Sequence, residues 1–281
     1  MADGPNIDLI VPKFKERPDF YQAAEQMGFH CLWFTEALFS RTGISWSGPK
    51  GKTDPDHFSV LATAAAATSR IRLGTAESSS PMTPILSYVT KIASVDNLSS
   101  GRLSLGIPHH DWEYEFALED RRPRSGVRLR ETITVLKSLW REAAVSFKGQ
   151  HINLENASID VKPVQAGGIP ILLGGASLNP AATLADGWVH PSGGIPEGAA
   201  RSCDYVRQMA SSVGRDPDSL ELGKIIYLAI DDNRGRARQR IAPLLQSFFS
   251  TATTWTVGAP LARRPSAPPS SKVSWMLASR Q

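Results

Sequence analysis

The sequence predicts an α/β chain that folds into one closed (β/α)8 barrel over residues 1–281. The chain has 281 residues, close to the roughly 250 that such a barrel contains. Apolar runs of strand length, many with β-branched residues, alternate with segments of helical periodicity. The eight expected strands are residues 7–11, 30–34, 71–76, 102–107, 169–173, 187–189, 222–230 and 273–277. This alternation favours a closed parallel barrel over the alternative, an open doubly wound sheet.

Helical periodicity occurs between the expected strands. The expected helices are residues 19–27, 56–68, 85–98, 127–140 and 201–213. Three connections are too long for simple turns, namely residues 38–55, 108–126 and 144–168. Because long loops at the C-terminal ends of barrel strands usually build the functional site, we expect these three connections to contribute to it.

Composition narrows the class of protein. The net charge of +4 and the pI near 9.1 come from scattered arginines, without the basic runs and interleaved aromatics of nucleic-acid binders. We therefore expect no nucleic-acid partner. Cys31 and Cys203 have neither metal-ligand nor disulfide spacing, so we expect reduced structural thiols and no metal site. No segment resembles a secretion signal or reaches the roughly 18 apolar residues of a membrane span, which favours a cytoplasmic protein.

Two stretches share a pattern in which a helix passes into a buried strand after a very short turn. Residues 56–76 run through an alanine-rich helix into Ile71-Arg-Leu-Gly-Thr-Ala76. Residues 94–107 make the same transition through the turn Ser99-Ser-Gly101. Such a transition is typical of the point where one βα unit meets the next.

Together these stretches resemble the bacterial-luciferase-like flavin monooxygenase family, which belongs to the luciferase-like monooxygenase and coenzyme F-420-dependent oxidoreductase superfamily. The resemblance extends over roughly residues 7–230. Its other parts are residues 131–140, 145–149, 162–165 and 169–177, and Ala185-Asp-Gly-Trp188. It implies a TIM barrel that holds FMN or the deazaflavin coenzyme F-420 at its C-terminal mouth.

The turn Gly174-Gly-Ala-Ser177 is the best ligand-binding candidate. Gly174 and Gly175 let the backbone approach an anion closely, because they have no side chain. The N–H groups and the dipole of the following short helix favour negative charge, and Ser177 adds a hydroxyl donor. The resemblance implies that this turn, Ala176 included, holds the flavin phosphate. The alternative is an ordinary helix-capping turn.

The ends of two other strands are also expected to contact the cofactor. By resemblance, the backbone at Thr75, Ala76 and Glu77 bulges against the central flavin ring, in some relatives through a cis peptide bond. Gly106 lies near the end of the next strand. His109 follows it, where family members carry an arginine or glutamate, and is expected to bind phosphate or to transfer a proton. The alternatives are an ordinary strand exit and a surface histidine.

Glu36 is the expected acidic residue of the site. The second strand corresponds to one in which relatives follow an acidic residue with one or two histidines, but here Ala37 and Leu38 follow Glu36. Glu36 shares strand parity with Leu32 and Phe34, so we expect it to face the barrel interior. There it is either catalytic or the partner of a neighbouring barrel residue.

Three aromatic residues are expected to line the substrate pocket. They are Phe34, at the end of the second strand, Trp46, in the glycine-rich and basic loop 38–55, and Trp112. The loop is expected to form a lid or wall of that pocket, or else a solvated loop, and the acidic segment around Trp112 a surface helix. Trp188 is expected to contact the cofactor, by analogy with the family.

The C-terminal part departs from the family pattern. Relatives have a helix after the element seen here as Gly258-Ala-Pro260, whereas residues 258–272 are rich in proline. Pro265, Pro268 and Pro269 exclude a long helix, since each costs about 3 kcal/mol inside one. We therefore expect an atypical, shortened end without an eighth helix, produced by trimming of the barrel or by a reading-frame change.

Three functions are compatible with these features. The first is a flavin-dependent oxidoreductase. If the cofactor is FMN, a separate reductase would supply it in reduced form, and the protein would be a monooxygenase that uses oxygen and a small organic substrate. If the cofactor is F-420, the protein would be a hydride-transfer enzyme. The second is a non-catalytic flavin-binding barrel. The third is a phosphate-binding lyase or isomerase with Glu36 and His109 as acid and base. Residues 56–68 and 85–98 look apolar on more than one face, which favours a homodimer, the usual family arrangement.

Overall fold

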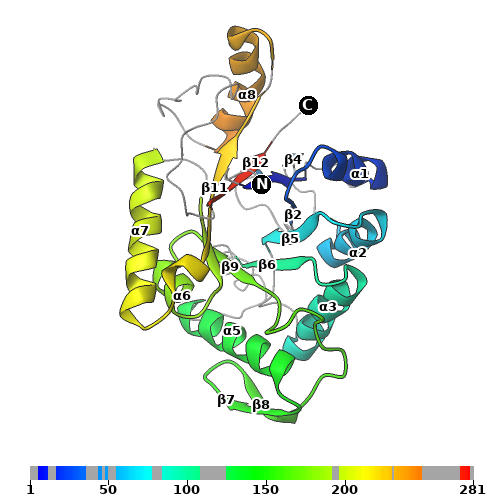
Figure 1. Cartoon of the computed structure of the whole chain (residues 1–281), viewed down its shortest axis with the longest axis vertical. Coiled ribbons are helices and arrows are strands. Elements are labelled where there is room, and N and C mark those ends of the chain that lie inside the picture. Colours follow the sequence, from blue (N-terminus) through cyan, green and yellow to red (C-terminus); the bar gives the residue numbers. More distant parts are fainter. Residues whose placement is uncertain are drawn as a thin grey trace.

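The structure, a computed structural model, describes residues 6–11, 17–35, 44–45, 48–49, 55–77, 84–107, 125–191, 196–229, 231–248 and 273–278. The eight expected strands form a closed barrel of parallel strands (Figure 1). In order around the barrel they are β1 (Asn6–Ile10), β2 (Cys31–Thr35), β5 (Arg72–Glu77), β6 (Leu103–Ile107), β9 (Ile171–Gly174), β10 (Gly187–His190), β11 (Glu221–Tyr227) and β12 (Val273–Ala278). Because β12 pairs with β1 and the order follows the chain, the predicted (β/α)8 barrel is confirmed.

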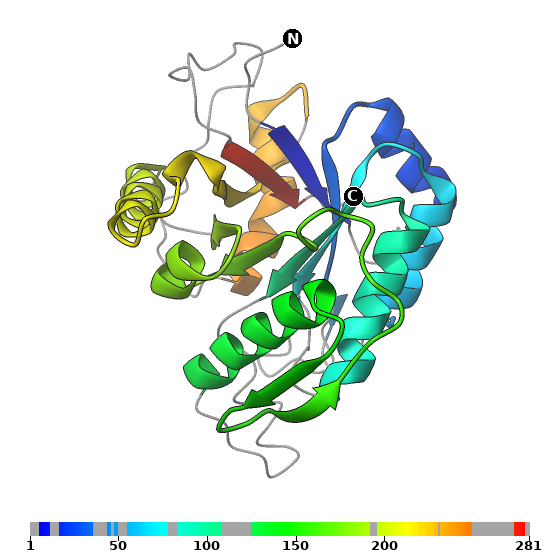
Figure 2. The same ribbon diagram turned by 60° about the horizontal axis from the view of Figure 1, so that its bottom comes forward.

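Helices surround the strands (Figures 1 and 2). They are α1 (Pro18–Gln26), α2 (His57–Ala67), α3 (Ile85–Leu98), α5 (Ser125–Arg141), α6 (Leu178–Thr183), α7 (Pro196–Ser212) and α8 (Arg234–Phe248). The five expected helices are confirmed as α1, α2, α3, α5 and α7. The sequence does not predict α8, because Gly235 and Pro243 interrupt its pattern and its mean hydropathy is low. None of the described helices is long and apolar enough to cross a membrane.

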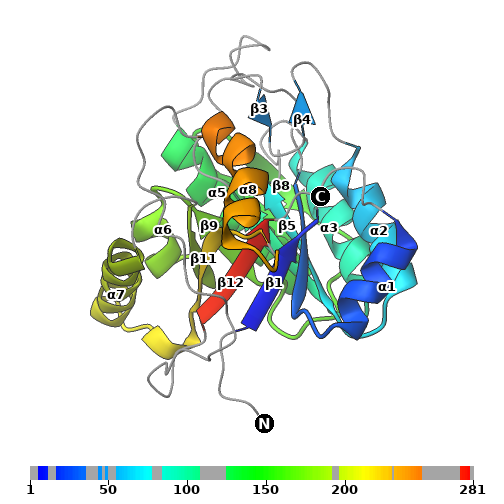
Figure 3. The same cartoon turned by 90° about the horizontal axis from the view of Figure 1, so that it is seen from above.

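Two small antiparallel sheets lie outside the barrel. They are formed by β3 (Ile44–Ser45) with β4 (Gly48–Pro49), and by β7 (Val145–Lys148) with β8 (Asn153–Ala157). The first pair follows β2 and lies near the C-terminal mouth, the end at which the barrel strands finish (Figure 3). The second is a hairpin beside α5 (Figure 2). The expectation that connection 144–168 belongs to the mouth is wrong, since it leads from α5 to the start of β9.

The two faces of the strands pack into separate clusters. Cys31 and Trp33 belong to a cluster that contains only strand residues, and this cluster fills the barrel interior. Leu32 and Phe34 belong to the larger cluster between strands and helices, where Phe34 packs edge-on against Tyr21 of α1 at 5.5 Å between ring centroids. The expectation that the parity of Leu32 and Phe34 marks the interior is therefore wrong. Both cysteines of the chain are free thiols, as predicted.

Charged side chains stabilise the short turns that lead from helices into strands. Arg102 donates to the carbonyl oxygens of residues 65, 68, 71 and 99, which joins the turn after α2 to the turn after α3. Glu25 of α1 accepts the backbone N–H groups of residues 69 to 71. Burial alone would raise the pKa of Glu25, but these three donors outweigh it and lower the pKa below its ordinary value. These contacts fix the barrel at the end opposite the mouth.

The indole of Trp33 fills the middle of the barrel interior. Trp33 is 1% exposed, and its Nε1 donates to Oδ2 of the buried Asp8 at 2.9 Å. The other oxygen, Oδ1, lies 2.9 Å from Nδ1 of His30. A Cβ at Gly74 would lie 2.6 Å from Cζ3 of Trp33, and one at Gly106 would lie 3.2 Å from the same atom. Glycine in β5 and β6 therefore leaves the space that the indole occupies.

We predict that Gly74→Ala destabilises the protein by about 1–3 kcal/mol, because the added methyl group overpacks the interior against Trp33. Urea denaturation measures the change in the free energy of unfolding. The matched control is Gly126→Ala in the first turn of α5, where a Cβ would have nothing within 4 Å; it should change the stability by no more than about 0.5 kcal/mol. Equal effects of the two variants would show that Trp33 does not require glycine at position 74.

Candidate functional site

The turn between β9 and α6, predicted to bind phosphate, lies at the C-terminal mouth. β9 ends at Gly174, and α6 begins directly after Ser177. Gly175 has a φ of 64°, a left-handed conformation that glycine adopts without steric cost. A Cβ at Gly174 would meet no heavy atom within 4 Å, and Ala176 is exposed. The turn therefore borders open space at the end of the strand.

The hydroxyl of Ser177 is the feature of this turn that indicates a ligand. Ser177 is 1% exposed, and its Oγ has no hydrogen-bond partner among the described residues. It stands at the N-cap of α6 without capping it, although serine there usually accepts a backbone N–H. A buried polar group without a partner costs about 1–3 kcal/mol. Since α6 has only 6 residues, the hydroxyl rather than the helix dipole is the main attraction for an anion.

Trp188 holds this turn from the neighbouring strand β10. Its Nε1 donates to the carbonyl oxygen of Gly175 at 3.1 Å, and its side chain packs in the layer between strands and helices. Trp188 thus orients the turn through Gly175. The predicted contact of Trp188 with the cofactor itself stays a prediction.

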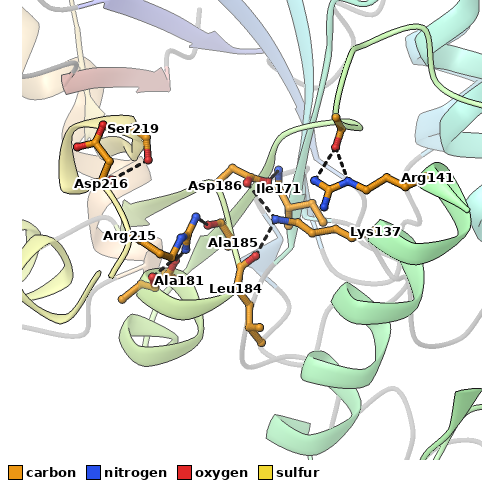
Figure 4. A network of polar contacts seen from close by, with 12 residues as sticks. Lys137, Arg141, Ile171, Ala181, Leu184, Ala185, Asp186, Arg215, Asp216 and Ser219 are labelled. Carbon is orange, nitrogen blue, oxygen red and sulfur yellow. Dashed lines mark hydrogen bonds and ion pairs between the residues drawn. The ribbon is translucent and has the colours of Figure 1, made fainter. Parts of the chain in front are cut away.

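Charged side chains fix α6 from its other end (Figure 4). Lys137 Nζ donates to the carbonyl of residue 184 at 2.7 Å and lies 2.9 Å from Oδ1 of Asp186. Oδ2 of Asp186 accepts the N–H of Ile171, the first residue of β9, at 2.9 Å. Arg215 donates to the carbonyl oxygens of residues 182 and 185, both at 2.7 Å. The start of β9 and the end of α6 are therefore held together, and the turn between them is positioned by both.

β5 bulges at the place that the family resemblance implies. Its pairing with β2 shifts register so that Ala76 is an extra residue between the paired Thr75 and Glu77. The hydroxyl of Thr75 accepts the N–H of Gly106 at 2.9 Å and donates to the carbonyl of Gly106 at 3.0 Å. The side chain of Thr75 thus replaces backbone pairing between β5 and β6 at the mouth. No peptide bond in the described ranges is cis.

The bulge also explains the glycine at position 106. A Cβ there would overlap the carbonyl oxygen of Thr75, which the bulge turns toward β6. The N–H and the carbonyl of Gly106 are both hydrogen-bonded to the hydroxyl of Thr75. Gly106 could therefore contribute to a ligand site only through the space left by its missing side chain. The predicted contacts of Thr75, Ala76 and Gly106 with a cofactor ring stay predictions.

Phe34, predicted to line a substrate pocket, lies at a small hollow at the mouth with a volume of about 10 Å³, room for about one water molecule. The hollow lies between the ends of β1 and β2 and the start of α2. The other residues that line it are Val11, Thr35, Pro55, His57 and Val60. His57 was not predicted as a site residue, because it lies inside the helical stretch 56–68 and belongs to no catalytic or binding motif. The one signal was its position at the start of a helix, directly after the connection 38–55.

A second polar group consists of a buried lysine, which was not predicted from the sequence, and His190, which by analogy with the family was expected to contact the cofactor. Lys224 of β11 is 7% exposed. Its Nζ lies 3.2 Å from Nδ1 of His190 and 3.3 Å from the carbonyl oxygen of Pro191, which also lies 2.7 Å from that Nδ1. Burial lowers the pKa of both Lys224 and His190. The signal for Lys224 was one basic residue inside the apolar strand 222–230.

The remaining predicted site residues lie outside the part of the chain that the structure describes. They are Glu36, with Ala37 and Leu38 after it, and Trp46, His109 and Trp112; of Glu77 only the backbone is described. The proline-rich residues 258–272 lie outside it as well. Among the described residues, no three histidine, cysteine, aspartate or glutamate side chains gather as a metal site.

Comparison with known proteins identifies the family to which the sequence is similar. Residues 3–273 match the family model described as luciferase-like monooxygenase. The F420-dependent glucose-6-phosphate dehydrogenase of Kineococcus radiotolerans is 29% identical over 229 residues, which are 78% of this chain and 65% of the relative. The FMNH(2)-dependent dimethylsulfone monooxygenase of Pseudomonas putida is 24% identical over 262 residues, 86% of this chain and 68% of the relative. This chain thus spans about two thirds of the length of these relatives.

Solved structures agree on the fold. Monooxygenase RslO1 from Streptomyces bottropensis has a TM-score of 0.74 and 24% sequence identity, over 87% of this chain and 77% of that one. The coenzyme F420 dependent tetrahydromethanopterin reductase from Methanopyrus kandleri has a TM-score of 0.71 and 18% identity, over 88% of this chain and 72% of that one. At these identities the likeness shows a common barrel fold.

We predict that Thr75→Val destabilises the protein by about 1–3 kcal/mol, because it leaves the buried N–H and carbonyl of Gly106 without their partner. Amide hydrogen exchange at Gly106 should become faster, while urea denaturation measures the loss of stability. The control is Thr134→Val on the exposed face of α5, where the hydroxyl donates to the carbonyl of residue 130; its effect should stay within about 0.5 kcal/mol. Unchanged exchange at Gly106 would contradict the role given to Thr75.

Proposed function

The chain belongs to the luciferase-like monooxygenase family, and from this membership we propose that it is an oxidoreductase that uses FMN or the deazaflavin coenzyme F-420. The observation that carries the proposal is the hydroxyl of Ser177, which is buried and without a partner among the described residues. It ends a glycine turn at the mouth of the barrel, where sites of such barrels lie. The proposed activity is inferred from relatives, and this chain spans about two thirds of their length.

The residues of the turn fit a phosphate group. The hydroxyl of Ser177 would donate to a phosphate oxygen and so gain the partner that it lacks among the described residues. Gly174 and Gly175 leave the backbone open to the ligand, since no side chain covers it. Trp188 would keep the turn in place through the carbonyl of Gly175. FMN and F-420 both carry a phosphate, so this site alone would accept either.

The strand ends on the other side of the mouth would support the cofactor ring. The bulge at Ala76 brings backbone toward the mouth, and Gly106 leaves space beside it. Trp33 lies in the interior below and is held by Asp8, which closes the barrel to water from that side. When bound, the cofactor would supply the redox chemistry, with oxygen for reduced FMN or with hydride for F-420. The protein would position it and exclude solvent.

The finer assignments belong to the same proposal. The substrate is a small organic molecule, and a monooxygenase of this kind would receive reduced FMN from a separate reductase. Glu36 and His109 are the proposed catalytic side chains. Trp46 and Trp112 are proposed to complete the pocket. Two copies of the chain would pair as a homodimer in the cytoplasm.

We predict that Ser177→Ala weakens binding of FMN or F-420 about ten- to hundredfold, because a hydrogen bond to a charged group is worth about 1.5–3 kcal/mol. Without cofactor the variant should be as stable as the parent or up to about 1 kcal/mol more stable, since it removes a buried hydroxyl that has no partner among the described residues. Fluorescence titration gives the affinity, and urea denaturation gives the stability.

The matched control is Ser99→Ala. Ser99 is equally buried, but its Oγ donates to the carbonyl of Asp96 at 3.0 Å and accepts the N–H of Arg102 at 3.3 Å. Ser99→Ala should therefore lose about 1 kcal/mol of stability and keep its cofactor affinity. A loss of stability in Ser177→Ala together with unchanged affinity would overturn the phosphate site. Tight cofactor binding without turnover of any substrate would favour the non-catalytic barrel instead.

A further inference from the structure

The buried lysine and the histidine beside it lie outside the barrel interior. His190, at the end of β10, is opposite Lys224 of β11 in the register of the two strands. The neighbouring side chains of Val189 and Ile225 pack in the interior cluster. Because side chains alternate between the two faces of a strand, His190 and Lys224 face the layer between the strands and the helices.

The carbonyl oxygen of Pro191 determines where the protons of this pair lie. It is 2.7 Å from Nδ1 of His190 and 3.3 Å from Nζ of Lys224. A carbonyl oxygen only accepts hydrogen bonds, so Nδ1 carries a proton and donates it to this oxygen. Nδ1 then cannot accept a hydrogen bond from Nζ, although the two nitrogen atoms are 3.2 Å apart. In the neutral imidazole, Nε2 is therefore the nitrogen that can take up a proton.

The surroundings of His190 disfavour its charged form. Burial lowers the pKa of His190, and the nearby ammonium group of Lys224 lowers it as well, while the hydrogen bond to Pro191 acts in the opposite direction. The ordinary pKa of histidine is about 6.5. The imidazole is therefore neutral at about pH 7 in the protein without ligand.

The helices that pack against β10 do not supply an unpaired counter-charge from their described side chains. α7 brings Cys203, and burial raises the pKa of this thiol. Asp204 and Arg207 of α7 form an ion pair with each other at 3.4 Å. α6 contains no charged residue. An anion that could stabilise the charged imidazole would therefore have to come from a ligand.

The imidazole of His190 is one side chain away from the glycine turn. Its ring lies edge-on to that of Trp188, with 5.5 Å between the centroids. The Nε1 of Trp188 donates to the carbonyl oxygen of Gly175, and β10 pairs with β9 up to the start of the turn. A phosphate bound at Ser177 would therefore act on the charge of His190, because charges in a protein interact over several ångströms.

We propose that His190 and Lys224 are the proton-dependent part of the phosphate site. Lys224 keeps the imidazole of His190 neutral in the protein without ligand. A phosphate on the glycine turn offsets the charge of Lys224, so the imidazole takes up one proton from solvent at Nε2. Lys224 is thus a positioning residue, because it acts on the ligand through His190. The proposal rests on the proposed function, which places the phosphate at Ser177.

The direction of the pH dependence follows from these charges. A bound anion favours the imidazolium, so the pKa of His190 is higher with the anion than without it. Affinity for a dianion should be greatest below the pKa of His190 in the protein without ligand. The gain should be lost as the pH rises through the higher pKa of the complex. We expect the affinity to change about three- to tenfold over this window.

The test uses sulfate as the probe, because sulfate remains a dianion over the whole pH range in which histidine titrates. In histidine-labelled protein without cofactor, NMR titration should give a higher pKa for His190 with sulfate than without it. The signals of His30 and His151 are internal references and should not respond to sulfate. No effect of sulfate on the titration of His190, or an equal effect on all three histidines, would overturn the proposal.

Substitutions at position 224 separate the charge of the lysine from its packing. Lys224→Arg keeps the charge and should leave the titration of His190 close to that of the parent. Lys224→Met keeps an apolar stem without charge, so the pKa of His190 without sulfate should rise. The pH at which sulfate affinity falls should rise with it. If His190 titrates alike in these two variants, the charge of Lys224 does not control it and the proposal fails.

Two further variants serve as controls. His190→Gln should bind sulfate equally well at about pH 5.5 and about pH 8, since it removes the titrating group. Lys162→Met should leave the titration of His190 unchanged, because Lys162 donates to the carbonyl oxygens of residues 139 and 142 after α5, away from the mouth. If a variant does not fold, the sulfate titration of the parent protein decides the proposal.

Titration with FMN and F-420 keeps this proposal apart from the proposed function. If a cofactor binds and the titration of His190 changes neither with cofactor nor with sulfate, the pair has no role and the proposed function stands. If neither cofactor binds while sulfate still raises the pKa of His190, the proposed function fails and the anion site remains. Cofactor binding together with a raised pKa of His190 supports both.

Discussion

The packing of Trp33 across the barrel interior is the constraint on which the mouth depends. The indole needs glycine at positions 74 and 106, and its orientation is fixed by the hydrogen bond to the buried Asp8. Above it, the bulge in β5 directs the carbonyl of Thr75 toward Gly106, so the same glycine is required for a second reason. The interior is thus filled from below, and above it the described ends of β5 and β6 present backbone at Thr75 and Gly106. Backbone of this kind lets a flat ring approach closely.

Stability and function are separated along the barrel axis, as is usual for this fold. Arg102 and Glu25 bind backbone groups where helices pass into strands, and Lys137, Asp186 and Arg215 hold β9 and α6 (Figure 4). These charged groups each have several partners, so they rigidify the end opposite the mouth. The mouth, by contrast, contains the hydroxyl of Ser177, which has no hydrogen-bond partner among the described residues. Such unsatisfied features are where a ligand gains most from binding.

The sequence predicts the strands well because each is a compact apolar run, and for the same reason it does not reveal which way their side chains face. In β2 every residue from Cys31 to Phe34 is apolar and buried, so no polar alternation marks the interior, and the parity assigned to Leu32 and Phe34 was wrong. The glycine turn was predictable from its residues, but the missing partner of Ser177 is a property of packing. His57 was missed because a single histidine at a helix start has no pattern; only the fold brings it to the strand ends.

The central claim is that the turn ending at Ser177 binds the phosphate of the cofactor. The most direct measurement compares, in the same protein, the affinity for FMN with that for riboflavin, and the affinity for F-420 with that for its phosphate-free deazariboflavin. The account predicts saturable binding of FMN or F-420 and at least about tenfold weaker binding of the matching phosphate-free compound. Equal affinity with and without phosphate, or binding of none of the four, would contradict it.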